Sequence, residues 1–161
     1  MALAMTGGPH KGYANDPAVW LSDRPVSLVV TGGSMEPFLK EGDRVEVVRT
    51  SPDELGRGQI IVMRRGTEVV VHRFLGGDTH RFLEKGDAQS RGNWWPWPEA
   101  IGVATAVIRD EDRLDLREVS WKAALRRAGS RHLMIHRFQV LSEMLPTATL
   151  RRFAARLLRL L

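Results

Sequence analysis

Residues 29–48, VVTGGSMEPFLKEGDRVEVV, decide the fold of this chain. Within them Ser34 stands between two glycines and a Met-Glu-Pro, and a Gly-Asp pair follows at positions 42–43. Apolar, β-branched residues flank the unit on both sides. Glycine lets the backbone turn sharply, and Pro37 stiffens the exit from that turn. The pattern predicts a serine hydroxyl presented on a corner between two strands.

Short β-type segments continue on both sides of this corner. Residues 26–30 form a β-branched run, and residues 44–49 begin by alternating polar and apolar side chains, as a half-buried strand does. Further strand-like segments follow at residues 59–63, 68–74, 80–84 and 101–109, with a hairpin connection at 64–67. Several short strands at this spacing predict a mainly β fold, a compact folded-over sheet or barrel.

Beyond the last predicted strand the sequence changes to helical spacing. Residues 120–145 are rich in Ala, Leu, Arg and Met, with Ser120 as a candidate cap and a candidate break at Gly129-Ser130. After Pro146, residues 147–161 predict another helix with a leucine stripe and four arginines. We therefore expect a C-terminal α-helical extension.

The chain of 161 residues has the length of one ordinary domain with a short appendage. Residues 1–24, rich in Gly, Pro, Asn and Asp, predict an irregular lead-in. Residues 25–110 are expected to form the β domain, and residues 111–161 a basic amphipathic extension. Hydrophobic residues make up 43% of the chain, which is enough for a core.

Composition limits the chemistry and the compartment. The chain has no cysteine, which excludes disulfides, thiol catalysis and cysteine-bound zinc, and fits a reducing compartment. The net charge of +5 suits nucleic acid, an anionic membrane surface or an acidic partner. Neither a membrane-spanning run nor a secretory signal is visible, so we expect a cytoplasmic protein, with peripheral contact at the inner face of the membrane as an alternative.

Five blocks in order carry a resemblance to a known family: GGSMEPFLKEGDRVEVV, GQIIVM, EVVVHRF, FLEKGDAQS and IGVATAVI. Together, over roughly residues 26–109, they resemble the superfamily of signal peptidase I and the LexA-like self-cleaving repressors. The resemblance implies a LexA/signal-peptidase-like β core and a serine endopeptidase activity. It implies neither a cofactor nor a metal.

The same resemblance implies roles for three residues. Ser34, in Ser-Met-Glu-Pro, is the nucleophile, and His72 occupies the strand position where most bacterial relatives carry a lysine base. In this respect the chain is similar to the endoplasmic-reticulum-type signal peptidases. Asp87, in Lys-Gly-Asp, is then the partner of His72, although those relatives carry a second aspartate that residues 88–93 lack.

The chemistry of these residue types agrees with the assignment. A neutral imidazole accepts the serine proton near neutral pH, and a carboxylate on its other nitrogen fixes the tautomer. A lysine base needs its pKa lowered by several units through burial. Lys85 is the one nearby lysine that offers an alternative base.

Residues expected to contact substrate lie around the serine and in a tryptophan-rich loop: Gly33, Met35, Pro37, Trp94 and Trp95. Two interpretations of the loop at residues 93–98 remain open. It covers one end of the core, or it forms a hydrophobic wall for substrate or a membrane surface.

The expected partner is a peptide or precursor protein, and removal of a leader or signal-type peptide is the specific hypothesis. A non-catalytic module that binds a peptide is the alternative. The C-terminal helix packs on protein or contacts an anionic membrane. Binding to nucleic acid is disfavoured, because LexA-like repressors carry an N-terminal helix-turn-helix that residues 1–25 do not supply.

Overall fold

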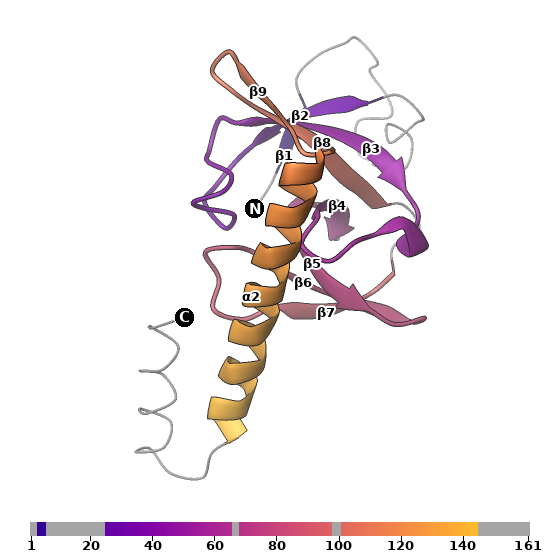
Figure 1. Cartoon of the computed structure of the whole chain (residues 1–161), viewed down its shortest axis with the longest axis vertical. Helices are drawn as coiled ribbons and strands as arrows, with labels where there is room; N and C mark the ends of the chain where they lie inside the picture. Colours follow the sequence, from indigo (N-terminus) through magenta and orange to yellow (C-terminus); the bar gives the residue numbers. More distant parts are fainter. Residues whose placement is uncertain (1–2, 6–24, 66–67, 98–100, 145–161) are drawn as a thin grey trace.

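A curved antiparallel sheet, crossed by one long helix, forms the body of the protein (Figure 1). The computed structural model describes residues 3–5, 25–65, 68–97 and 101–144. Within these ranges the strands follow the spatial order β1-β2-β3-β8-β4-β5-β6-β7, and β9 pairs with β8. The strands are β1 (Leu3–Met5), β2 (Val26–Val30), β3 (Arg44–Thr50), β4 (Ile60–Arg65), β5 (Glu68–Gly77), β6 (Arg81–Lys85), β7 (Asn93–Pro96), β8 (Ile101–Arg109) and β9 (Asp112–Asp115). The expected mainly β fold is confirmed.

Three strands were not expected from the sequence. β7 lies in the tryptophan-rich segment and ends at Pro96, and it is the last strand in the sheet order, where a proline costs no ladder hydrogen bond. β9 is a polar hairpin partner of β8 that follows Asp110 at φ +55°. β1, which lies in the segment expected to be irregular, pairs with β2. Residues 6–24 lie outside the described residues.

Helix α2 (Val119–Met144) is continuous, so the expected break at Gly129-Ser130 is wrong. The physical reason is a close approach between two backbones. A Cβ on Gly129 would lie 2.5 Å from the Cα of Gly58, which itself has φ +91°. Gly129 is therefore a packing residue inside the helix. Among the described residues, no helix is long and apolar enough to span a bilayer. The helix expected at 147–161 lies outside the described residues.

The described part of the chain contains two apolar clusters. The main core contains Leu28, Val30, Met35, Leu39, Val45, Val47, Ile60, Val62, Val71, Ala104, Val107, Leu116 and Leu125. The second core contains Ile61, Met63, Val70, Phe74 and Phe82, with Leu55, Trp95 and Trp97 packed against it.

Strand β5 divides its side chains between these cores. Val71 packs in the main core, whereas Val70 and Phe74 pack in the second core. Because successive side chains of a strand point to opposite faces, His72 shares the face of Val70 and Phe74. Arg73 lies on the same face of the sheet as Val71. This alternation sets which polar groups meet on each side of the sheet.

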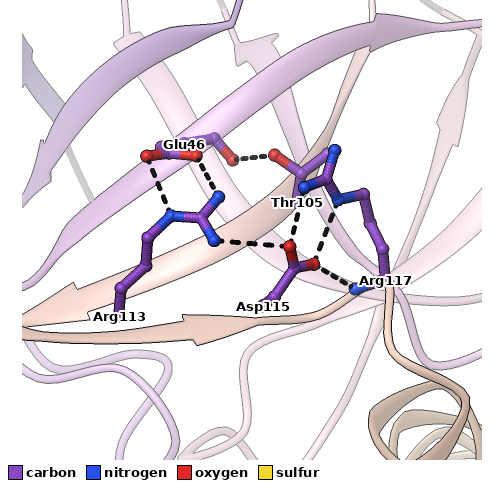
Figure 2. A network of polar contacts seen from close by, with 5 residues as sticks. All are labelled: Glu46, Thr105, Arg113, Asp115 and Arg117. Atoms are coloured by element: carbon purple, nitrogen blue, oxygen red, sulfur yellow. Dashed lines mark hydrogen bonds and ion pairs between the residues drawn. The ribbon is translucent and has the colours of Figure 1, made fainter.

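A surface ion-pair network fixes the β9 hairpin just before helix α2 begins. Figure 2 shows Arg113 reaching Glu46 of β3, while Asp115 lies between Arg113 and Arg117. The Nη2–Oε2 distance from Arg113 to Glu46 is 2.8 Å. Hydrogen bonds from Arg117 and Arg113 hold the pKa of Asp115 well below its usual range. These contacts join β9 to β3 at the point where the chain turns into α2.

Candidate active site

Ser34 sits on the loop between β2 and β3, as the motif predicts. Gly32 adopts φ +81°, a left-handed conformation that glycine reaches without steric cost. Met35 and Leu39 are fully buried in the main core, and the Leu39 N–H donates to the Met35 carbonyl at 3.0 Å. Met35 and Leu39 thus anchor the loop in the main core, while Ser34 is half-buried.

The Lys-Gly-Asp block supports the backbone of this loop. The Ala88 N–H donates to the carbonyl of Ser34 at 3.0 Å. A Cβ on Gly86 would lie 2.5 Å from the same carbonyl oxygen, so only glycine fits there. The turn that follows β6 therefore fixes the position of the Ser34 backbone.

His72 of β5 is the side chain that meets the serine. The hydroxyl of Ser34 donates to Nε2 of His72 at 3.1 Å, and His72 itself is buried. A distance in this range is what general-base catalysis requires. The structure thus brings together the predicted nucleophile and the predicted base.

Glu84 of β6 occupies the other nitrogen of the imidazole. Nδ1 of His72 donates to Oε2 of Glu84, which is fully buried. The second oxygen, Oε1, accepts from Nε1 of Trp95 at 3.0 Å and from Nδ2 of Asn93 at 3.3 Å. Burial favours a higher pKa for Glu84, but the hydrogen bonds from His72, Trp95 and Asn93 outweigh it and the pKa is lowered. The carboxylate is ionised, and it keeps the proton of His72 on Nδ1.

Asp87, the expected partner of His72, has a different neighbour. It pairs with Arg73 through two hydrogen bonds, one of them 2.7 Å from Nε to Oδ1. Arg73 is 2% exposed, donates through Nη1 to the Gly58 carbonyl at 2.8 Å, and lies over the ring of Phe38. The pair neutralises a buried guanidinium, and the structure does not bring Asp87 to the imidazole.

Lys85 points away from the serine and does not replace His72. Its Nζ donates to the Gly86 carbonyl at 3.2 Å and to Nδ1 of His132 at 2.9 Å. Burial lowers the pKa of Lys85 to about 8, against the raising influence of Asp87. Because Glu84 and Lys85 are adjacent on β6, their side chains leave opposite faces of the strand.

The tryptophan segment mainly covers the second core. Trp97 stacks on Phe82 with ring centroids 4.9 Å apart, and its Nε1 donates to the Asp78 carbonyl at 2.8 Å. Trp95 packs on the same core and bonds Glu84. For these two rings the covering interpretation agrees with the structure.

The residues expected to contact substrate are divided by the fold. Gly33 and Pro37 are exposed on the Ser34 loop, whereas Met35 is fully buried beneath it. Trp94 is 46% exposed, and it lines a cavity of about 280 Å³ with residues of β5, β6 and α2 rather than with Ser34. The guanidinium of Arg81 lies 4.7 Å above the centre of the Trp94 ring.

Sequence reasoning missed Glu84 and the two contacts that hold its carboxylate: Asn93 had no predicted role, and Trp95 was expected to contact substrate. A signal for Glu84 was present, because it alternates with Phe82 on a short apolar strand, and a lone acid on a buried face needs a partner. Nothing in the sequence pointed to the indole of Trp95 as a hydrogen-bond donor. Among the described residues, no group of three or more His, Asp or Glu side chains is arranged to hold a metal ion.

A hydroxyl, an imidazole and a carboxylate joined in one hydrogen-bonded series form the arrangement that defines serine hydrolases. The chain belongs to the Peptidase S24-like family, whose model matches residues 6–87, and this family indicates a serine-peptidase type of function. The matched segment contains Ser34, His72 and Glu84. Searches of curated proteins and of solved structures found no match.

Proposed function

We propose that this protein is a serine endopeptidase that uses Ser34, His72 and Glu84 as a catalytic triad. The observation that carries the proposal is the unbroken series of hydrogen bonds from the Ser34 hydroxyl through the imidazole to the buried carboxylate. The use of histidine as the base agrees with the resemblance to the endoplasmic-reticulum-type signal peptidases. In this chain Glu84 supplies the acid.

The reaction follows from these contacts. Oγ of Ser34 attacks the peptide carbonyl carbon while its proton passes to Nε2 of His72. The tetrahedral intermediate collapses, the C–N bond breaks, and the imidazolium gives its proton to the leaving amine. A water molecule then attacks the acyl ester, passes a proton to Nε2, and releases the acid product as the hydroxyl of Ser34 is restored.

Glu84 and the loop backbone stabilise charge that develops during these steps. The ionised carboxylate stabilises the imidazolium and keeps Nε2 directed at Ser34. Gly32 and Gly33 bend the backbone before the serine, which suits the Ser34 amide to act as a donor to the oxyanion. Removing one such donor in a serine peptidase costs roughly 10²–10³ in turnover.

The proposed substrate is an extended peptide laid along a strand edge beside the serine. The exposed Gly33 and Pro37 flank the nucleophile and are the residues we expect such a chain to touch first. The resemblance to signal peptidases suggests small side chains immediately before the cleaved bond. Removal of a leader or signal-type segment from a precursor is the specific activity we propose.

A peptide library tests this proposal. The purified protein is incubated with a proteome-derived library, and new termini are identified by mass spectrometry, with Ser34→Ala as the matched control. We expect wild-type-specific termini with a common pattern before the cut. A different result would indicate a peptide-binding module. In that case folded wild type produces no termini beyond those of Ser34→Ala, and both proteins still bind library peptides.

A further inference from the structure

Helix α2 lies against the part of the sheet that holds the triad. In Figure 1 the helix runs from the end of β9 past β5, β6 and β7. Among the helix residues whose burial is described, Leu125, Gly129 and His136 are buried, and His132 lies between Gly129 and His136 on the same side. These residues are spaced three or four apart, so they form one face of the helix. Two histidines one turn apart therefore point toward the sheet.

His132 contacts the turn that supports the serine. Its Nε2 lies 3.3 Å from Oδ1 of Asp87, and its Nδ1 accepts from Nζ of Lys85 at 2.9 Å. Asp87 stands between Gly86, which packs on the Ser34 carbonyl, and Ala88, whose N–H donates to that carbonyl. His132 thus holds the turn on which the backbone of Ser34 rests.

His136 contacts the end of the turn between β6, which carries Glu84, and β7. Its Nδ1 accepts from the Gly92 N–H at 3.1 Å. A Cβ on Gly92 would lie 2.5 Å from the carbonyl oxygen of Glu84, so this turn packs directly on the strand that carries the acid. The next residue, Asn93, and Trp95 donate to the Glu84 carboxylate. His136 thus fixes the start of the segment that orients Glu84.

Both contacts use Nδ1 as an acceptor, which a protonated imidazole lacks. For His132, burial lowers the pKa to about 4, against the influence of Asp87, so the ring is neutral at physiological pH.

We propose that His132 and His136 are positioning residues, one for each end of the triad, and that α2 is required for the reactivity of Ser34. The proposal rests on the proposed function of the triad. It assigns the helix a role in the reaction, although α2 lies outside the segment matched by the family model.

Conservative and apolar variants separate this role from simple packing. His136→Asn places an amide oxygen near the position of Nδ1, whereas His136→Leu removes the acceptor. His132→Gln keeps a donor near the position of Nε2, whereas His132→Leu removes it. The readout is the rate of labelling by a fluorophosphonate probe, divided into maximal rate and probe affinity. His80→Leu, at an exposed histidine, is the control.

We expect each leucine variant to lower the maximal labelling rate by roughly tenfold or more, with unchanged probe affinity. His136→Leu loses the hydrogen bond from the Gly92 N–H, and His132→Leu loses its contacts with both Asp87 and Lys85. The Asn and Gln variants should stay within about threefold of wild type. If His136→Leu does not fold, His136→Gln replaces it, because its longer side chain misplaces the acceptor and the same loss is expected. Folded leucine variants that label at the wild-type rate overturn the proposal.

Amide hydrogen exchange makes the test independent of activity. Exchange at Gly92 should quicken in His136→Leu but not in His136→Asn, and exchange at Ala88 should quicken in His132→Leu. If folded wild type never reacts with the fluorophosphonate probe, the proposed function is contradicted. The exchange rates at Gly92 and Ala88 still test the contacts of the two histidines. Unchanged exchange at both amides overturns the positioning role.

Discussion

At the level of single residues, Glu84 and Asp87 show how two carboxylates three positions apart acquire different partners. Glu84 faces the imidazole of His72 and accepts two further hydrogen bonds. Asp87 neutralises the buried guanidinium of Arg73. Removing the Glu84 carboxylate would leave the buried imidazole of His72 without its acceptor, and removing the Asp87 carboxylate would leave the buried guanidinium of Arg73 without its counter-ion. Only Glu84 contacts the base. The acid of the proposed triad is therefore Glu84.

The substitution Glu84→Gln tests this assignment. An amide of the same size cannot stabilise the imidazolium and favours the wrong tautomer, so we expect cleavage or labelling to fall by about 10²–10⁴. The measurement is the rate constant for folded protein at neutral pH, with the exposed Glu41→Gln as the control. A rate for Glu84→Gln that matches the control would remove Glu84 from the triad.

The sequence predicted Ser34 and His72 because each stands in a short motif with a fixed neighbourhood. It did not predict the acid, because that depends on the register between β5 and β6. The register shifts between Phe74 and Gly76, so counting residues does not reveal which acid lies beside His72. Asp87 belongs to the family-like block, but its position beyond the end of β6 directs it to Arg73.

At the level of elements, helix α2 is placed by a contact between two glycines. A Cβ on Gly58 would lie 1.7 Å from the Leu125 carbonyl, and Gly129 meets Gly58 from the helix side. Glycine inside a predicted helix normally suggests a break, since it costs about 1 kcal/mol relative to alanine. Here the absence of a side chain at Gly129 lets the helix pack closely on the backbone of Gly58. No local pattern in the sequence reveals this contact.

The variant Gly129→Ala should destabilise the protein although it raises helix propensity. The added methyl has no room, so we expect a loss of about 1–3 kcal/mol in the free energy of unfolding, measured by urea denaturation. Ser130→Ala, at an exposed position of the same helix, should be neutral or slightly stabilising. A gain in stability for Gly129→Ala would show that the two backbones are not in contact.

The contact of α2 with the sheet should also depend on pH through His132. Its pKa falls from 6.5 in the unfolded chain to about 4 in the folded protein. Between these values the unfolded chain binds the extra proton, so the stability present above pH 6.5 is lost as the pH falls to 4. Asp87 favours protonation of the ring, and Lys85, Arg73 and Arg131 oppose it.

We expect this linkage to contribute up to about 3 kcal/mol over that range. Urea denaturation at a series of pH values measures it as the difference between wild type and His132→Gln, because carboxylates that titrate in both proteins cancel. Parallel curves for the two proteins from pH 7 to pH 4 would contradict a neutral, buried His132.

At the level of the whole molecule, the sheet and the helix share one core. Leu125 of α2 belongs to the same apolar cluster as residues of β2, β3, β4, β5 and β8. The composition of residues 111–161 separates them from the β domain in sequence, but the packing of Leu125 depends on contacts distant along the chain. We therefore expect α2 to unfold together with the sheet.

Hydrogen exchange under native conditions checks this cooperation. Amides at residues 125–136 should exchange with an opening free energy close to that of amides in β4 and β5, because they open only when the main core does. If the helix amides open at a free energy several kcal/mol lower, α2 is a separate unit, and its proposed role at the triad loses its structural basis.

The most direct test of the central claim is covalent labelling of the serine. Wild-type protein is treated with a fluorophosphonate probe at neutral pH, and the modified residue is located by peptide mapping. We predict a single adduct on Ser34, absent in Ser34→Ala and strongly slowed in His72→Ala and Glu84→Gln. Folded wild type that does not label, or an adduct that persists in Ser34→Ala, would contradict the assignment of a Ser34–His72–Glu84 triad.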